Sequence, residues 1–89
     1  MMVMTATEEG AEILALQALG WLAGQPERMD RFLALTGLEA DTLRAVAGSP
    51  DTARAVLDFL LADEDILLDF CEMAQIPPKS LPAYRDRLG

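Results

Sequence analysis

The residues of this sequence that could perform covalent chemistry are few. The chain of 89 residues contains no histidine and only one cysteine, one tyrosine and one lysine. Nucleophilic catalysis needs a base beside the nucleophile, most often histidine, so Ser-His and Cys-His arrangements are excluded. Cys71 follows Phe70 in an apolar stretch, where a cysteine is typically a small buried hydrophobic residue. Ser49 and Ser80 stand at expected helix starts, where a hydroxyl serves as a cap. The sequence therefore predicts that the protein is not an enzyme.

A set of acidic side chains in the second half of the chain could instead form a metal site. Its members are Asp58, Asp63, Glu64, Asp65, Asp69 and Glu72. Carboxylates suit hard cations, but the set lacks the glycine-containing loop of a calcium site and the Glu-x-x-His pairs of a di-metal bundle. Acids at 63–65 suit the positively polarised start of a helix, and the others solvate exposed faces. We expect no metal ion, no cofactor and no small-molecule ligand, since glycine-rich phosphate-binding motifs are also missing.

Length and composition predict one small domain. Hydrophobic residues make up 52% of the chain, more than a disordered protein carries. The apolar run Ile13–Ala23 is too short to span a bilayer, and residues 1–10 lack the basic flank of a signal peptide. With one cysteine no intrachain disulfide can form, which favours a cytoplasmic location. We expect a flexible tail at residues 1–6, a single helical domain at 7–89, and no contact with a membrane.

The helix-capping and helix-ending residues of the sequence predict an all-α fold, a compact bundle of five to six short helices. No segment alternates apolar and polar residues in the way of a half-buried strand. Caps, prolines and glycines divide the chain at regular intervals. The expected helices run from Thr5 or Thr7 to Ala23, Pro26 to Thr36, Glu39 to Ala47, Pro50 to Ala62, Asp63 to before Pro77, and Ser80 to Arg87.

Helical spacing predicts which side chains are buried. The first helix has apolar residues all round its axis, so we expect a central position for it. Its apolar residues are Ile13, Leu14, Leu16, Leu19, Trp21 and Leu22. In the fourth helix the predicted core residues are Val56, Leu57, Leu60 and Leu61. In the fifth they are Ile66, Leu67, Phe70, Met73 and Ala74. Phe59 falls outside its helix's stripe, and we predict an apolar interaction surface at Trp21 and Phe59.

The chain also resembles itself at an offset of 38 residues, which suggests two related three-helix halves at 11–48 and 49–89. Over the aligned stretch six positions are identical, where composition alone would give roughly three. The identical pairs are Ala15/Ala53, Leu19/Leu57, Leu22/Leu60, Phe32/Phe70, Leu43/Leu81 and Ala45/Ala83. Two amphipathic helix sets could align through their shared period alone, so both explanations remain open. In each half we expect a tight corner with a buried core, built by Phe32, Leu35, Leu38 and Leu43 and again by Phe70, Met73, Ile76 and Leu81.

Net charge limits the partners. The chain carries 15 acidic and 7 basic residues, a net charge of −8, which disfavours nucleic acid and anionic membranes. The turn at Thr36-Gly37-Leu38 resembles that of a helix-turn-helix protein, but the helix after it begins with Glu39 and Asp41 and offers only Arg44 to bases.

Two long stretches, "ALQALGWLAGQPERMDRFLALTGLEADTLRAVAGSP" and "AVLDFLLADEDILLDFCEMAQIPP", resemble a small bacterial family, domain of unknown function 3572. The most recognisable pieces are "RFLALTGL", the pair Leu43-Arg44 and "VLDFLLADE", and the resemblance extends from about Glu12 to Leu88. It implies a compact helical protein and brings no activity, cofactor or catalytic residue.

The sequence therefore predicts a non-enzymatic helical protein-interaction module that self-associates, or binds another protein, through apolar surface beyond the needs of a small core. The alternative is a helix-turn-helix-like regulatory domain that contacts DNA, directly or through a basic partner.

Overall fold

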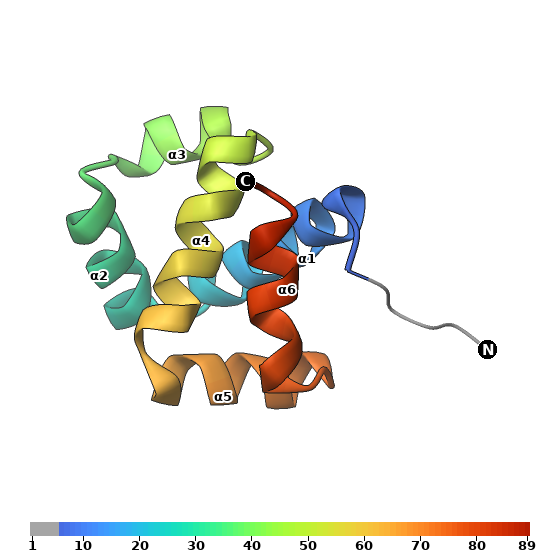
Figure 1. The fold of residues 1–89 in the computed structure, drawn as a ribbon. Helices are drawn as coiled ribbons and strands as arrows, with labels where there is room; N and C mark the ends of the chain where they lie inside the picture. Colours follow the sequence, from blue (N-terminus) through green and yellow to red (C-terminus); the bar gives the residue numbers. More distant parts are fainter. Residues whose placement is uncertain (1–5) are drawn as a thin grey trace.

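The computed structural model describes residues 6–89, and every regular element within them is a helix (Figure 1). The helices are α1 (Glu8–Ala23), α2 (Pro26–Thr36), α3 (Ala40–Val46), α4 (Pro50–Ala62), α5 (Glu64–Ala74), the 3₁₀ helix η1 (Pro78–Ser80) and α6 (Leu81–Asp86). The predicted all-α bundle of short helices is confirmed. Most of the predicted flexible tail, residues 1–5, lies outside the described residues.

Side-chain caps determine where three of the helices begin. The hydroxyl of Thr7 accepts a hydrogen bond from the amide of Gly10 at 2.9 Å, so Thr7 caps α1. Ser49 caps α4, and the carboxylate of Asp63 caps α5. The predicted cap at Ser80 is wrong: its hydroxyl donates to the carbonyl of Pro77 at 2.7 Å, within the 3₁₀ turn. The backbone of Ser80 is already helical, whereas a capping residue has an extended backbone. Its hydroxyl therefore accepts no hydrogen bond from the amides at the start of α6.

The core lies between α1 and α4, which form the most extensive helix–helix contact of the described chain. Alanines at 11, 15 and 18 on α1 and at 53 on α4 are almost completely buried, and their small size lets the two helices approach closely. α6 packs against both α1 and α4, α2 contacts the same two helices from the other side of α4, and α5 packs against α4 (Figure 1).

Four residues expected in the core lie at the surface instead. Ile13 and Leu16 of α1 are exposed because the buried residues of α1 share the side that faces its neighbours, and no described helix covers the other side. Leu35 on α2 and Met73 on α5 are also exposed, and they are equivalent at the offset of 38. Each lies in the last turn of its helix, on a side that the neighbouring helices leave open, whereas the next residues, Thr36 and Ala74, are half-buried. The other corner residues, including Phe32, are buried or half-buried.

The backbone repeats at the same offset. α2 and α5 each contain 11 residues, and each ends at a residue in the left-handed conformation: Gly37 with φ 73° and Gln75 with φ 57°. In the structure Gln75 takes the left-handed position, and Pro77 and Pro78 follow it. These matches support the two predicted halves, although common descent of the halves stays a prediction.

Candidate functional site

The serine, cysteine and tyrosine side chains that could act in catalysis are engaged in local hydrogen bonds or buried. The Ser49 hydroxyl accepts from the amide of Thr52 and donates to its hydroxyl. Cys71 is almost completely buried, and burial raises the pKa of its thiol, which disfavours the nucleophilic thiolate. Tyr84 is buried in the core as well.

The acidic set does not come together around a common centre. Asp58 pairs with Arg85 at 2.6 Å and Asp69 with Arg28 at 2.7 Å, each linking two helices. Asp63 caps α5. In the described part of the chain, no three cysteine, aspartate or glutamate side chains are grouped in a way that could hold a metal ion.

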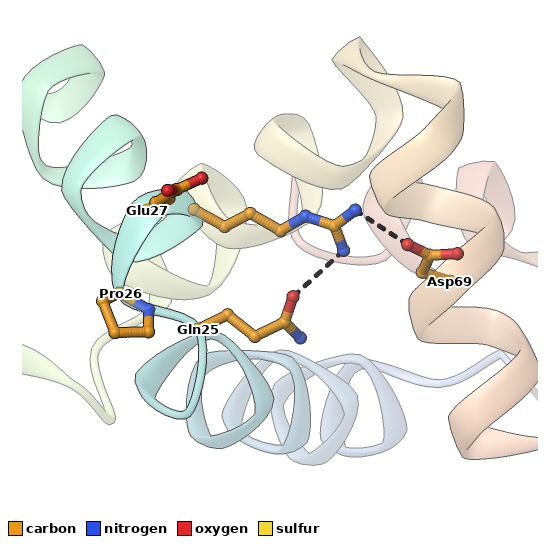
Figure 2. Close-up of a pocket in the computed structure, with 5 residues that line it drawn as sticks. Gln25, Pro26, Glu27 and Asp69 are labelled. Atoms are coloured by element: carbon orange, nitrogen blue, oxygen red, sulfur yellow. Dashed lines mark hydrogen bonds and ion pairs between the residues drawn. The ribbon is translucent and has the colours of Figure 1, made fainter.

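Trp21, the first residue of the predicted interaction surface, is half-buried and covered by a cation. Its ring packs against Phe70 with 5.5 Å between the ring centroids. The guanidinium carbon of Arg28 lies 5.4 Å from the Trp21 ring centroid. Figure 2 shows that the same guanidinium group donates to Gln25 and to Asp69. The hollow beside it, about 510 Å³, is lined by these three residues, which already bind one another, and by Pro26 and Glu27.

Phe59, the second predicted surface residue, belongs to the core, and this prediction is wrong. Only 6% of its surface is exposed, and its ring packs edge-on against Phe32 at 5.4 Å. The helical stripe of α4 considered alone excluded Phe59. α2, however, lies against a second side of α4 and covers the ring there.

A mostly apolar groove lies between α2 and α4, and we call it the α2–α4 groove. It consists of two adjoining hollows of about 270 and 330 Å³ that share Thr36 and Ala55. Its lining residues are Phe32, Leu35, Thr36, Leu38, Val46, Ser49, Asp51, Thr52, Ala55, Asp58, Phe59 and Ala62. Leu35 forms part of its wall with 70% of its surface exposed.

The polar groups in the α2–α4 groove are satisfied without a ligand. The Thr36 hydroxyl donates to the carbonyl of Phe32 and accepts from the amide of Leu38, which leaves its methyl group for the groove. Ser49 and Thr52 bind each other. The groove therefore offers apolar contact and two carboxylates at its edge, Asp51 and Asp58.

Sequence reasoning missed this groove because it assigned Leu35 to the core. Helical spacing places Leu35 near Phe32 on α2, and no local pattern in the sequence shows that the neighbouring helices leave Leu35 exposed.

A second apolar hollow, of about 290 Å³, lies between α1, α2 and α3. It is lined by Leu19, Ala23, Met29, Ala40, Leu43, Arg44 and Ala47. Three of these are alanines, whose short side chains leave the space between the helices unfilled.

Comparison with protein families decides what the chain is related to. The family described as "Protein of unknown function (DUF3572)" matches residues 8–89. The chain belongs to this family. The match covers both halves, so the whole described helical bundle of this DUF3572 protein corresponds to the family's pattern. No curated protein and no solved structure matches the chain. Among the described residues of the DUF3572 chain, no helix combines the length and apolar character needed to cross a bilayer.

Proposed function

We propose that this DUF3572 protein is a non-enzymatic interaction module that binds a protein partner through the α2–α4 groove. The observation that carries the proposal is the position of Leu35: a large apolar side chain, 70% exposed, on the wall of an apolar groove. Exposed apolar groups that converge on a groove are typical of surfaces covered by a partner, whereas scattered ones are common and need no explanation.

The floor of the groove supports this use. Phe32 and Phe59 are buried and interlocked edge-to-face, so they form a rigid apolar base. A rigid base loses little conformational entropy when a partner binds. The satisfied hydroxyls of Thr36 and Ser49 need no new hydrogen-bond partner when water leaves.

The alternative, contact with DNA through α3, is supported less well. The guanidinium of Arg44 pairs with Asp41 at 3.0 Å, one helical turn away, on an exposed face. A recognition helix whose arginine is held by a neighbouring carboxylate has lost the donor that would read a base edge. The net charge of −8 adds repulsion from phosphate groups.

The experiment is site-specific photo-crosslinking in cells that naturally contain the protein. A photoreactive amino acid replaces Leu35 in the groove or, as the matched control, the equivalent exposed residue Met73 on α5. We expect a discrete crosslinked product from position 35 and none from position 73. A product at twice the chain's mass identifies self-association, and one of another mass identifies a different protein.

A second substitution tests whether the crosslink at position 35 reports binding in the groove or only a chance encounter with another protein. Ala55→Glu places a charged side chain on the shared floor of the groove, so the product from position 35 should disappear. No discrete product from position 35, or equal products from positions 35 and 73, would contradict the proposal.

A further inference from the structure

The chemistry of the α2–α4 groove also identifies a class of partner. We infer that the groove binds a basic amphipathic helix from another protein; this inference rests on the proposed function and makes it more specific. It combines the apolar floor, the length of the groove and the sign of the charges at its edge.

The groove has the length of a short helix. Its lining on α4 extends from Asp51 to Ala62, which at about 1.5 Å per residue corresponds to about 17 Å, or three helical turns. The opposite wall is formed by the end of α2, the turn after it and the end of α3, including Leu35, Leu38 and Val46. A helix with apolar residues at positions i, i+4 and i+7 places one anchor in each turn of such a groove.

The charged groups that line the groove are all acidic. Asp51 and Asp58 lie seven residues apart on α4, so both face the same side of the helix. Each carboxylate is in an ion pair, with Arg54 and Arg85 respectively, yet Asp51 remains 89% exposed and Asp58 remains 58% exposed. Arg54 engages only Oδ1 of Asp51, so the other oxygen can accept a hydrogen bond from a lysine or arginine side chain beside the anchors of a bound helix. Both oxygens of Asp58 accept from Arg85, so Asp58 contributes through its exposed negative charge.

The rest of the described chain strengthens this preference. Five arginines are already held in ion pairs, and acidic residues outnumber basic ones by 15 to 7 in the whole sequence. An acidic helix would meet repulsion at the groove's edge and from the surrounding field, whereas a basic helix would be attracted by both. A second copy of this chain carries the same net charge of −8, so it is a poorer occupant.

The test uses two designed helical peptides with identical apolar anchors, one flanked by lysine and arginine and the other by glutamate. Each is titrated into the full chain labelled for NMR, and affinity is measured in parallel by fluorescence anisotropy at low and moderate salt. We expect the basic peptide to shift the signals of groove residues such as Leu35 and Ala55. The acidic peptide should bind at least about tenfold more weakly, and added salt should weaken the basic peptide alone.

Three variants locate the binding. Leu35→Gln should abolish binding of the basic peptide, while Met73→Gln at the equivalent exposed position should leave it unchanged. The double variant D51N/D58N should weaken the basic peptide by about three- to tenfold and reduce its salt dependence. If loss of the Asp58–Arg85 pair unfolds the double variant, the salt dependence of the native chain still measures the charge contribution.

Equal affinity for the two peptides, signal shifts away from the groove, or no binding of either would overturn this inference. So would a crosslinked homodimer as the main product from position 35. In each of these cases a specific product from position 35 would still support the interaction module, whereas loss of that product would remove the module itself.

Discussion

Two aromatic pairs occupy equivalent places in the two halves of the molecule, but their surroundings differ. Phe32 packs against Phe59, and Phe70 packs against Trp21, with ring centroids 5.4 and 5.5 Å apart. The offset of 38 maps each residue of one pair onto a residue of the other. Each pair joins the long helix of one half to the second helix of the other. The halves therefore hold each other through a reciprocal contact.

The difference lies in what covers the pairs. Arg28 stacks on Trp21 and pairs with Asp69, which makes the surface over the second pair polar. At the position equivalent to Arg28 the other half has Ile66, which is buried. The Phe32–Phe59 pair has no such cationic cover, and the apolar α2–α4 groove lies over it. The same helical framework thus carries a cation over one aromatic pair and an apolar groove over the other.

The largest effect should come from the buried partner of each pair. Phe32→Ala and Phe70→Ala should each lower the free energy of unfolding by about 3–4 kcal/mol, since both rings are completely buried. Urea denaturation followed by circular dichroism measures both. Leu35→Ala serves as the exposed control and should cost less than about 0.5 kcal/mol. If one phenylalanine costs less than half as much as the other, the two halves are not equivalent in packing.

The turns that end α2 and α5 should respond in opposite directions to an exchange of residues. Gly37→Gln should destabilise the protein by about 1 kcal/mol, because an L-residue is strained at φ 73°. No neighbouring atom would meet an added Cβ at Gly37, so the cost comes from the backbone alone. Gln75→Gly removes the equivalent strain and should stabilise by about 0.5 kcal/mol, after the greater entropy of unfolded glycine is subtracted. Changes of the same sign, measured by thermal denaturation, would show that the two turns differ in strain.

Removing the positive charge of Arg28 should leave the Trp21–Phe70 pair without a cation over it, as the Phe32–Phe59 pair is. Arg28→Gln loses the contact with Trp21 and the ion pair with Asp69 and should cost about 1 kcal/mol. Trp21 is the only tryptophan, so its fluorescence should shift to longer wavelength and become more accessible to quenchers. Arg44→Gln is the control, because its highly exposed ion pair within one helix should contribute almost nothing. Unchanged tryptophan fluorescence in Arg28→Gln would contradict the covering role.

The smallest effect should come from filling the hollow between α1, α2 and α3. Ala23, Ala40 and Ala47 line it, whereas the offset of 38 places Leu61, Pro78 and Arg85 at the equivalent positions. Ala23→Leu copies the residue of the second half and should stabilise the protein by about 0.5 kcal/mol through added apolar burial. Thermal unfolding monitored at several protein concentrations separates this gain from association. A lower melting temperature would mean that the hollow cannot accept the larger side chain.

The sequence by itself determined the helices and most of their ends. Thr7, Ser49 and Asp63 cap their helices through side-chain oxygens, and Gly37 ends α2, because these are short-range effects that need no tertiary contact. It also identified Cys71 as a buried residue and the family to which the chain belongs. The interaction function stays a prediction. It is inferred from the absence of catalytic residue types in the sequence and from apolar content beyond the needs of a small core.

Only the tertiary structure decided which faces of the helices are covered. Helical periodicity shows which residues share a face, but the burial of that face depends on how distant helices cross. For this reason Phe59 is buried under α2, although it lies outside the stripe of its own helix, while Leu35 and Met73 project beyond their neighbours into solvent. The cover that Arg28 forms over Trp21 likewise joins residues of three helices, α1, α2 and α5. The α2–α4 groove exists because α2 and α4 lie side by side and only Val46, at the end of α3, adds to its lining from a third helix. No local pattern in the sequence specifies that arrangement.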